Sequence, residues 1–72
     1  MKALAKRSLT LEGHRTSLAL EPAFWAVLQT EAATRGLSLP GLIARIDASR
    51  GERPLASACR LAALEIALRQ RR

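Results

Sequence analysis

The chain has 72 residues, with one cysteine, one histidine, and 12 lysines and arginines against six acidic residues, which gives a net charge of +6. One cysteine cannot form an intramolecular disulfide, and one Cys with one His cannot supply the four ligands of a structural zinc site. Folding so short a chain buries only roughly 60% of the surface of the unfolded chain, so oligomerisation is the remaining way to enlarge its core.

The excess of basic residues favours a polyanionic partner, although solubility alone can also account for it. No apolar run approaches the roughly 20 residues that cross a bilayer, and the N-terminus lacks the hydrophobic stretch of a signal peptide. The lack of a cysteine framework fits a reducing compartment. We therefore expect a soluble, cytoplasmic protein that makes no membrane contact.

The first 13 residues show no clear periodicity and are expected to form a flexible arm. The next segment, His14–Leu20, has the period of a half-buried strand. Its residues alternate between two sides, with Thr16, Leu18 and Leu20 on one and Arg15, Ser17 and Ala19 on the other. Everything after Pro22 reads as helix, so this strand has no partner in its own chain. Pairing with a second copy across a two-fold axis would stabilise it, which predicts a dimer.

The first helix is predicted from about Pro22 to Arg35. Proline favours the first helical position, Glu21 adds negative charge near the helix N-terminus, and Gly36 ends the helix. Its apolar residues fall near one face, namely Phe24, Trp25, Leu28 and Ala32, with Val27 widening the stripe. Stacking of the two aromatic side chains on bases is the functional alternative, but their helical spacing favours packing in the core.

A second and a third helix follow. Ser38 is a good N-cap for a segment that ends near Arg50 and has a regular amphipathic pattern, Leu39, Leu42, Ile43 and Ile46. After a polar connection over residues 51–54, the third helix runs roughly from Leu55 to Arg69 and has a broad apolar surface. The residues from Arg69 to Arg72 form a basic tail, which either touches phosphates or only aids solubility.

The order and spacing of these elements resemble the ribbon-helix-helix family of bacterial DNA-binding proteins. The similarity rests on Arg15-Thr-Ser-Leu-Ala-Leu-Glu-Pro22, which is similar to the family's strand and helix start, and on Gly36-Leu-Ser-Leu39, which is similar to its inter-helix turn. It covers residues 14–50, and the whole chain looks like a branch of the family with an additional C-terminal helix. The resemblance implies a mainly α fold with one short N-terminal strand, in the order β-α-α plus a third helix, forming an intertwined homodimer. The arm then spans residues 1–13, the core 14–50, and the C-terminal helix and tail 51–72.

In the family, two protomers pair their strands into a ribbon that enters the major groove of double-stranded DNA. By this resemblance Arg15, Ser17 and Ala19 would face base edges, although Ala19 offers only a methyl contact where the family usually has a longer side chain. Ser38 and Leu39 would lie near phosphates at the start of the second helix, where Ser38 also serves as a simple cap. The interlocked helices and strands imply a shared dimer core of Leu18, Leu20, Trp25, Leu28, Leu42, Ile43 and Ile46.

The sequence favours a DNA-binding transcription regulator that is not an enzyme and needs no cofactor or metal. His14 has no neighbouring nucleophile or ligand set, and Cys59 lies on an apolar helix line, which is typical of a buried residue. The alternative is a protein-interaction module, such as an antitoxin-like dimer that binds a partner through its C-terminal helix. Exposure of Leu61, Leu64 and Leu68 would favour such a partner. A membrane-surface helix is disfavoured because the polar face of the last helix carries little charge.

Overall fold

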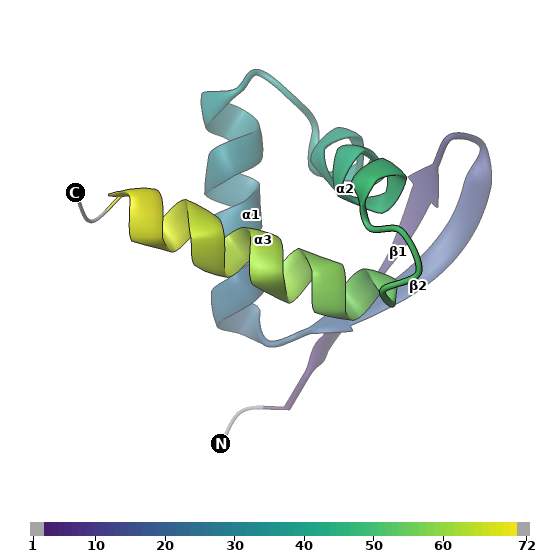
Figure 1. Cartoon of the computed structure of the whole chain (residues 1–72). Helices are drawn as coiled ribbons and strands as arrows, with labels where there is room; N and C mark the ends of the chain where they lie inside the picture. The colour runs from purple at the N-terminus through teal and green to yellow at the C-terminus, as the bar shows by residue number, and fades with distance from the viewer. Residues whose placement is uncertain (1–2, 71–72) are drawn as a thin grey trace.

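A β-hairpin forms the N-terminal part of the molecule. The computed structural model describes residues 3–70, and in it β1 (Ala5–Leu11) pairs antiparallel with β2 (His14–Leu20) (Figure 1). The two-residue loop between them has positive φ angles, 51° at Glu12 and 86° at Gly13. Type I′ turns need this conformation at both central residues, and their twist matches that of the flanking strands. The Glu12–Gly13 pair therefore closes the hairpin tightly.

The predictions of a single strand and of a flexible arm over residues 1–13 are wrong for residues 5–11. Leu9 and Leu11 are buried, and Thr10 between them is exposed, so β1 has a buried side of its own. β1 also supplies the hydrogen-bonding partner that β2 lacked in the sequence analysis. β2 is therefore paired within its own chain, and the intertwined homodimer remains a prediction.

The three helices follow the predicted order, as α1 (Pro22–Thr34), α2 (Leu39–Ser49) and α3 (Leu55–Gln70). At the end of α1, Gly36 has φ 71°, its N–H donates to Ala33 O at 3.1 Å, and the Leu37 N–H donates to Ala32 O at 2.8 Å. This pair of bonds is the Schellman arrangement, in which glycine adopts the left-handed conformation without steric cost. Gly36 therefore ends α1 as predicted.

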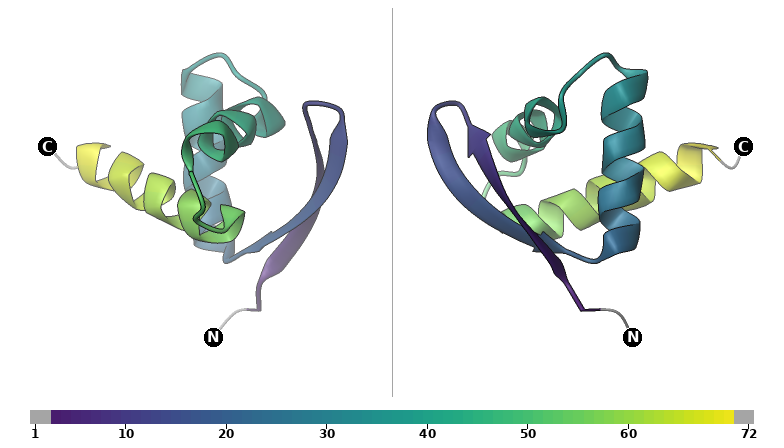
Figure 2. Two further views of the ribbon diagram at one scale, coloured as in Figure 1. Left: turned by 45° about the vertical axis from the view of Figure 1, so that its right-hand side comes forward. Right: turned by 180° about the vertical axis from the view of Figure 1, so that it is seen from behind.

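The helices pack on one face of the hairpin, with α2 against β1 and α3 against β2 (Figure 2). The core lies between these two layers. Its fully buried large side chains come from the hairpin and all three helices, namely Leu20, Leu28, Ile43 and Cys59. Six of the seven predicted dimer-core residues are buried within this single chain, and Ile46 is partly buried. Their burial therefore needs no second copy.

Candidate nucleic-acid interface

The outer face of β2 carries the three residues that were expected to face DNA bases. Arg15 and Ser17 are exposed and Ala19 is half-buried, whereas Leu18 and Leu20 are buried on the opposite face. The predicted alternation along this strand is therefore confirmed. Figure 2 shows the helices on only one side of the hairpin, so no part of residues 3–70 covers the other side.

The outer face of the hairpin also includes side chains of β1, a strand that was not predicted from the sequence. Directly opposed residues of an antiparallel pair share a face. By the register, the outward residues of β1 are Lys6, Ser8 and Thr10, opposite Ala19, Ser17 and Arg15 respectively. All three β1 residues are exposed. The alternation of Leu9 and Leu11 with polar neighbours was the signal that could have revealed them.

Trp25 of α1 anchors the N-terminal strand. Its Nε1–H donates a 2.7 Å hydrogen bond to the carbonyl oxygen of Ala5, and the Arg7 guanidinium carbon lies 4.8 Å from the centroid of its ring. The indole is buried, so its N–H needs this acceptor, and the cation over the ring is attracted by the π electrons. Trp25 thus holds β1 at two residues and packs in the core, as the sequence predicted, instead of stacking on bases.

The start of α2 has few free donors for a phosphate. The Gly41 N–H donates to Ser38 Oγ at 3.0 Å, and Pro40 has no N–H. The first three positions of α2 are Leu39, Pro40 and Gly41. Among them only Leu39 has an N–H without a hydrogen-bond acceptor in residues 3–70. Ser38 is therefore an N-cap, as expected, and it belongs to the helical layer instead of the hairpin. A phosphate contact here remains a prediction.

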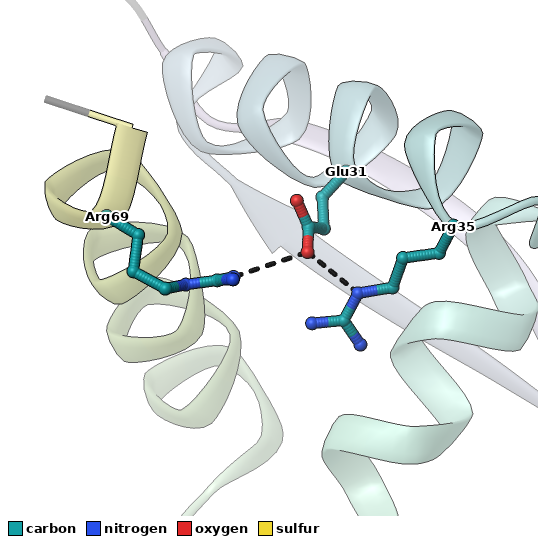
Figure 3. Close-up of polar contacts among 3 residues, drawn as sticks. All are labelled: Glu31, Arg35 and Arg69. Carbon is teal, nitrogen blue, oxygen red and sulfur yellow. Dashed lines mark hydrogen bonds and ion pairs between the residues drawn. The ribbon is translucent and has the colours of Figure 1, made fainter. Parts of the chain in front are cut away.

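Two ion pairs link α3 to α1 and to Glu21, the residue before α1. Buried Glu31 accepts hydrogen bonds from Arg35 Nε at 2.7 Å and from an Arg69 terminal nitrogen at 3.3 Å (Figure 3). These bonds, chiefly the one from Arg35, lower the pKa of Glu31 below its ordinary value of 4.5. Nearer the start of α3, Arg60 donates to Glu21 Oε1 at 2.8 Å, which lowers the pKa of that carboxyl also.

The outer side of α3 carries a row of exposed leucines, which we call the leucine row: Leu61, Leu64 and Leu68, with 43%, 50% and 55% of their surface exposed. Their spacing of three and four residues aligns them on one helix face. The opposite side of α3 is buried, since Cys59, Ala63 and Ile66 pack in the core. The three leucines are therefore exposed in the single chain, and such exposure was expected to favour a protein partner.

The remaining candidate residues offer no reactive site. Cys59 has no exposed surface, and burial, with a smaller effect from the Asp47 carboxylate, raises the pKa of its thiol to about 11. A neutral, buried thiol is a poor nucleophile, so its predicted core position is confirmed. His14 is exposed beside the hairpin turn. Residues 3–70 contain no group of three or more His, Cys, Asp or Glu side chains that could hold a metal ion.

The comparisons with known proteins agree with this architecture. The sequence matches the protein family described as "Ribbon-helix-helix domain" over residues 4–67, which includes β1 and most of α3. No curated protein and no solved structure matches the chain. The helices in the described part of the chain are too short or too polar for any of them to span a bilayer.

Proposed function

The chain belongs to the ribbon-helix-helix domain family, and from this premise we propose that it binds double-stranded DNA through the outer face of its hairpin and regulates transcription. Proteins of this family bind DNA as transcription regulators or antitoxins. The observation that carries the proposal is the exposure of Arg15 and Ser17 on the side of the hairpin that the helices leave open. Arginine bonds guanine in a bidentate manner and serine bonds several base edges, while Ala19 adds a methyl contact.

The shape and charge of the protein also support this function. A two-stranded ribbon is narrow enough to enter the major groove, which is about 12 Å wide. The net charge of +6 favours association with the phosphate backbone. The free N–H of Leu39, beside the Ser38 cap, supplies one candidate donor to a phosphate at the start of α2.

DNA binding across a salt series tests the proposal. Wild-type protein should bind a short random-sequence duplex with an affinity that falls steeply as salt rises. Arg15→Ala should weaken binding, and Arg45→Ala, which removes an equal charge from exposed α2 surface, should change it little. A folded protein that ignores DNA at low salt would refute the proposal.

A second candidate function, contact with another protein chain, is favoured by the leucine row. Three neighbouring exposed leucines form an apolar face on one helix, and contiguous exposed apolar surface marks interaction sites. Proteins of the family dimerise. Because β2 is already paired with β1, an unpaired strand is not the reason for this chain to dimerise. We therefore assign the leucine row to a second copy, so that the α3 helices pack against each other in a homodimer.

The oligomeric state tests this assignment. Sedimentation equilibrium should give twice the chain mass at micromolar concentration, independently of DNA. A monomer at all concentrations would exclude the second copy as the occupant and leave the leucine row to a different partner, as in the antitoxin-like alternative.

A further inference from the structure

The hairpin presents two columns of polar residues to solvent, one from each strand. The columns are set by the register, in which Lys6 lies opposite Ala19, Ser8 opposite Ser17, and Thr10 opposite Arg15. Five of these six side chains can donate or accept a hydrogen bond, and the sixth is alanine. Both strands belong to one chain, so a single protomer carries a complete two-stranded ribbon.

The two cations of this face lie at opposite ends of the ribbon and on different strands. Lys6 and Thr10 are four residues apart along β1, which is roughly 13 Å of extended strand, and Arg15 is the partner of Thr10. This length corresponds to about four base-pair steps of 3.4 Å. Ser8 and Ser17 lie opposite each other between the two charges, and Thr10 lies beside Arg15. The face thus has a cation at each end and hydrogen-bonding groups in its middle.

Lys6 lies opposite Ala19, the one outward residue of β2 whose side chain has no polar group. Ala19 is small, so it leaves room for the longer side chain across the ribbon. The backbone at Lys6 is held in place, because the residues on either side of it, Ala5 and Arg7, both contact Trp25. A residue on an anchored strand has less backbone freedom to lose on binding.

We infer that β1 is part of the DNA-reading surface, with Lys6, Ser8 and Thr10 contacting the same major groove as Arg15 and Ser17. This inference rests on the proposed function and extends it to the strand that sequence analysis treated as an arm. Lys6 contacts a phosphate or a guanine at the end of the ribbon where β2 offers only Ala19. Ser8 shares the reading of the central bases with Ser17, and Thr10 contacts bases beside Arg15.

The experiment compares four single variants on DNA, namely Lys6→Ala, Lys6→Arg, Arg15→Ala and Arg45→Ala. The probes are a random-sequence duplex at several salt concentrations and the duplex that wild-type protein enriches from a random library. Lys6→Ala should weaken binding about five-fold or more and reduce the slope of the salt dependence by about one, while Lys6→Arg should restore both. Arg45→Ala should stay within about two-fold of wild type.

A second readout addresses the hydroxyl residues. Library enrichment with Ser8→Ala should relax the base preference at central positions, and Thr10→Val should relax it at the positions beside those that Arg15 contacts. Neither variant should change the salt slope, because hydroxyls release no counterions. Circular dichroism checks that each variant keeps the fold.

The outcomes separate the inference from the function on which it rests. If Lys6→Ala behaves like Arg45→Ala, and the β1 hydroxyl variants keep the wild-type preference, while Arg15→Ala weakens binding, then β1 is not a reading strand and the proposed function stands. If wild-type protein does not bind DNA, or Arg15→Ala and Lys6→Ala both bind as well as wild type, the proposed function fails and the inference fails with it.

Discussion

The outer face of the hairpin and the outer face of α3 are both left uncovered by the rest of the described chain, and they differ in chemistry. The hairpin exposes Lys6, Arg15 and hydroxyl groups, whereas α3 exposes the leucine row. Both elements contribute buried apolar residues to the same core on their inner sides, so the core does not explain the difference. A polar face is stable in water and suits a polyanion, while an apolar face gains free energy when another apolar surface covers it. One small fold therefore presents a polar surface and an apolar surface to solvent.

Reversal of charge on the hairpin should have the largest effect. Lys6→Glu combined with Arg15→Glu removes two contacts, each worth about 1–3 kcal/mol, so the affinity for DNA should fall by at least about 30-fold. The thermal stability should change little because both side chains are exposed. Fluorescence anisotropy with a labelled duplex measures the affinity.

The matched control reverses two arginines on the helical side, Arg45→Glu with Arg53→Glu, which changes the net charge equally. Its affinity for DNA should fall much less. Equal losses in the two double variants would mean that net charge, and not the hairpin face, determines binding.

A charge in the leucine row should have the next largest effect, this time on self-association. Leu64→Lys places a cation at the middle of the row, and loss of a hot-spot contact at the centre of an interface costs about 2 kcal/mol or more of binding energy. The dimer should dissociate about 30-fold more readily, while DNA binding per protomer persists. Sedimentation equilibrium measures the dissociation constant.

Leu4→Lys is the control, because Leu4 is equally exposed but lies before β1 and outside the leucine row. If it dissociates the dimer as strongly as Leu64→Lys, the row has no special role. If neither variant changes the association of a dimeric wild type, the contact lies elsewhere.

The sequence predicted the helices better than the hairpin, for identifiable reasons. Ser38, Gly36 and Pro22 mark helix ends through local chemistry, so α1 and α2 begin and end within about a residue or two of their predicted bounds. The turn at Glu12 has no such mark, since the first central position of a type I′ turn usually holds asparagine, aspartate or glycine. Only Gly13 and the spacing of Leu9 and Leu11 indicated a strand and a turn in this segment.

The outward residues of the hairpin were predicted for only one of its two strands, for the same reason. The alternation of His14–Leu20 identified the outward residues of β2, and the structure confirms which of them are exposed. The register of β1 depends on the hairpin, so the position of Lys6 opposite Ala19 could not be read from periodicity. The leucine row was visible in the sequence, but its exposure depends on how α3 turns toward the core.

Removal of the Trp25 indole N–H should have a moderate effect that separates the hairpin from α3. Trp25→Phe loses the hydrogen bond to the Ala5 carbonyl and weakens the attraction to Arg7, so the free energy of unfolding should fall by about 1–2 kcal/mol. Hydrogen exchange should show the amides of β1 losing more protection than those of α3. Urea unfolding measures the loss of stability.

The comparison variant is Phe24→Leu, because the Phe24 ring faces Arg60 of α3 at 6.0 Å in the same kind of contact but makes no hydrogen bond. It should lower the stability less than Trp25→Phe and leave the exchange of β1 unchanged. Equal loss of protection in β1 for the two variants would mean that Trp25 does not specifically anchor this strand.

Acid should loosen α3 before it affects the hairpin, and this effect should be the smallest. Glu31 and Glu21 hold α3 through Arg69 and Arg60, and both carboxyls have a pKa below 4.5 in the folded protein. The stabilisation of the folded protein by these two ion pairs is thus fully present above about pH 4.5. It is lost as the pH falls through the folded pKa values of the two carboxyls. The urea midpoint of wild-type protein should therefore decrease between about pH 5 and pH 3.

The variant Glu31→Gln tests the part of this pH dependence that comes from one ion pair. Since the side-chain amide of glutamine does not ionise in this range, the variant should be less stable than wild type at about pH 6 and lose less on acidification. Glu65→Gln is the control, because Glu65 is an exposed α3 residue without an ion pair in residues 3–70, and it should follow wild type. Identical pH dependence in wild type and Glu31→Gln would mean that this ion pair does not set how α3, and with it the leucine row, is oriented.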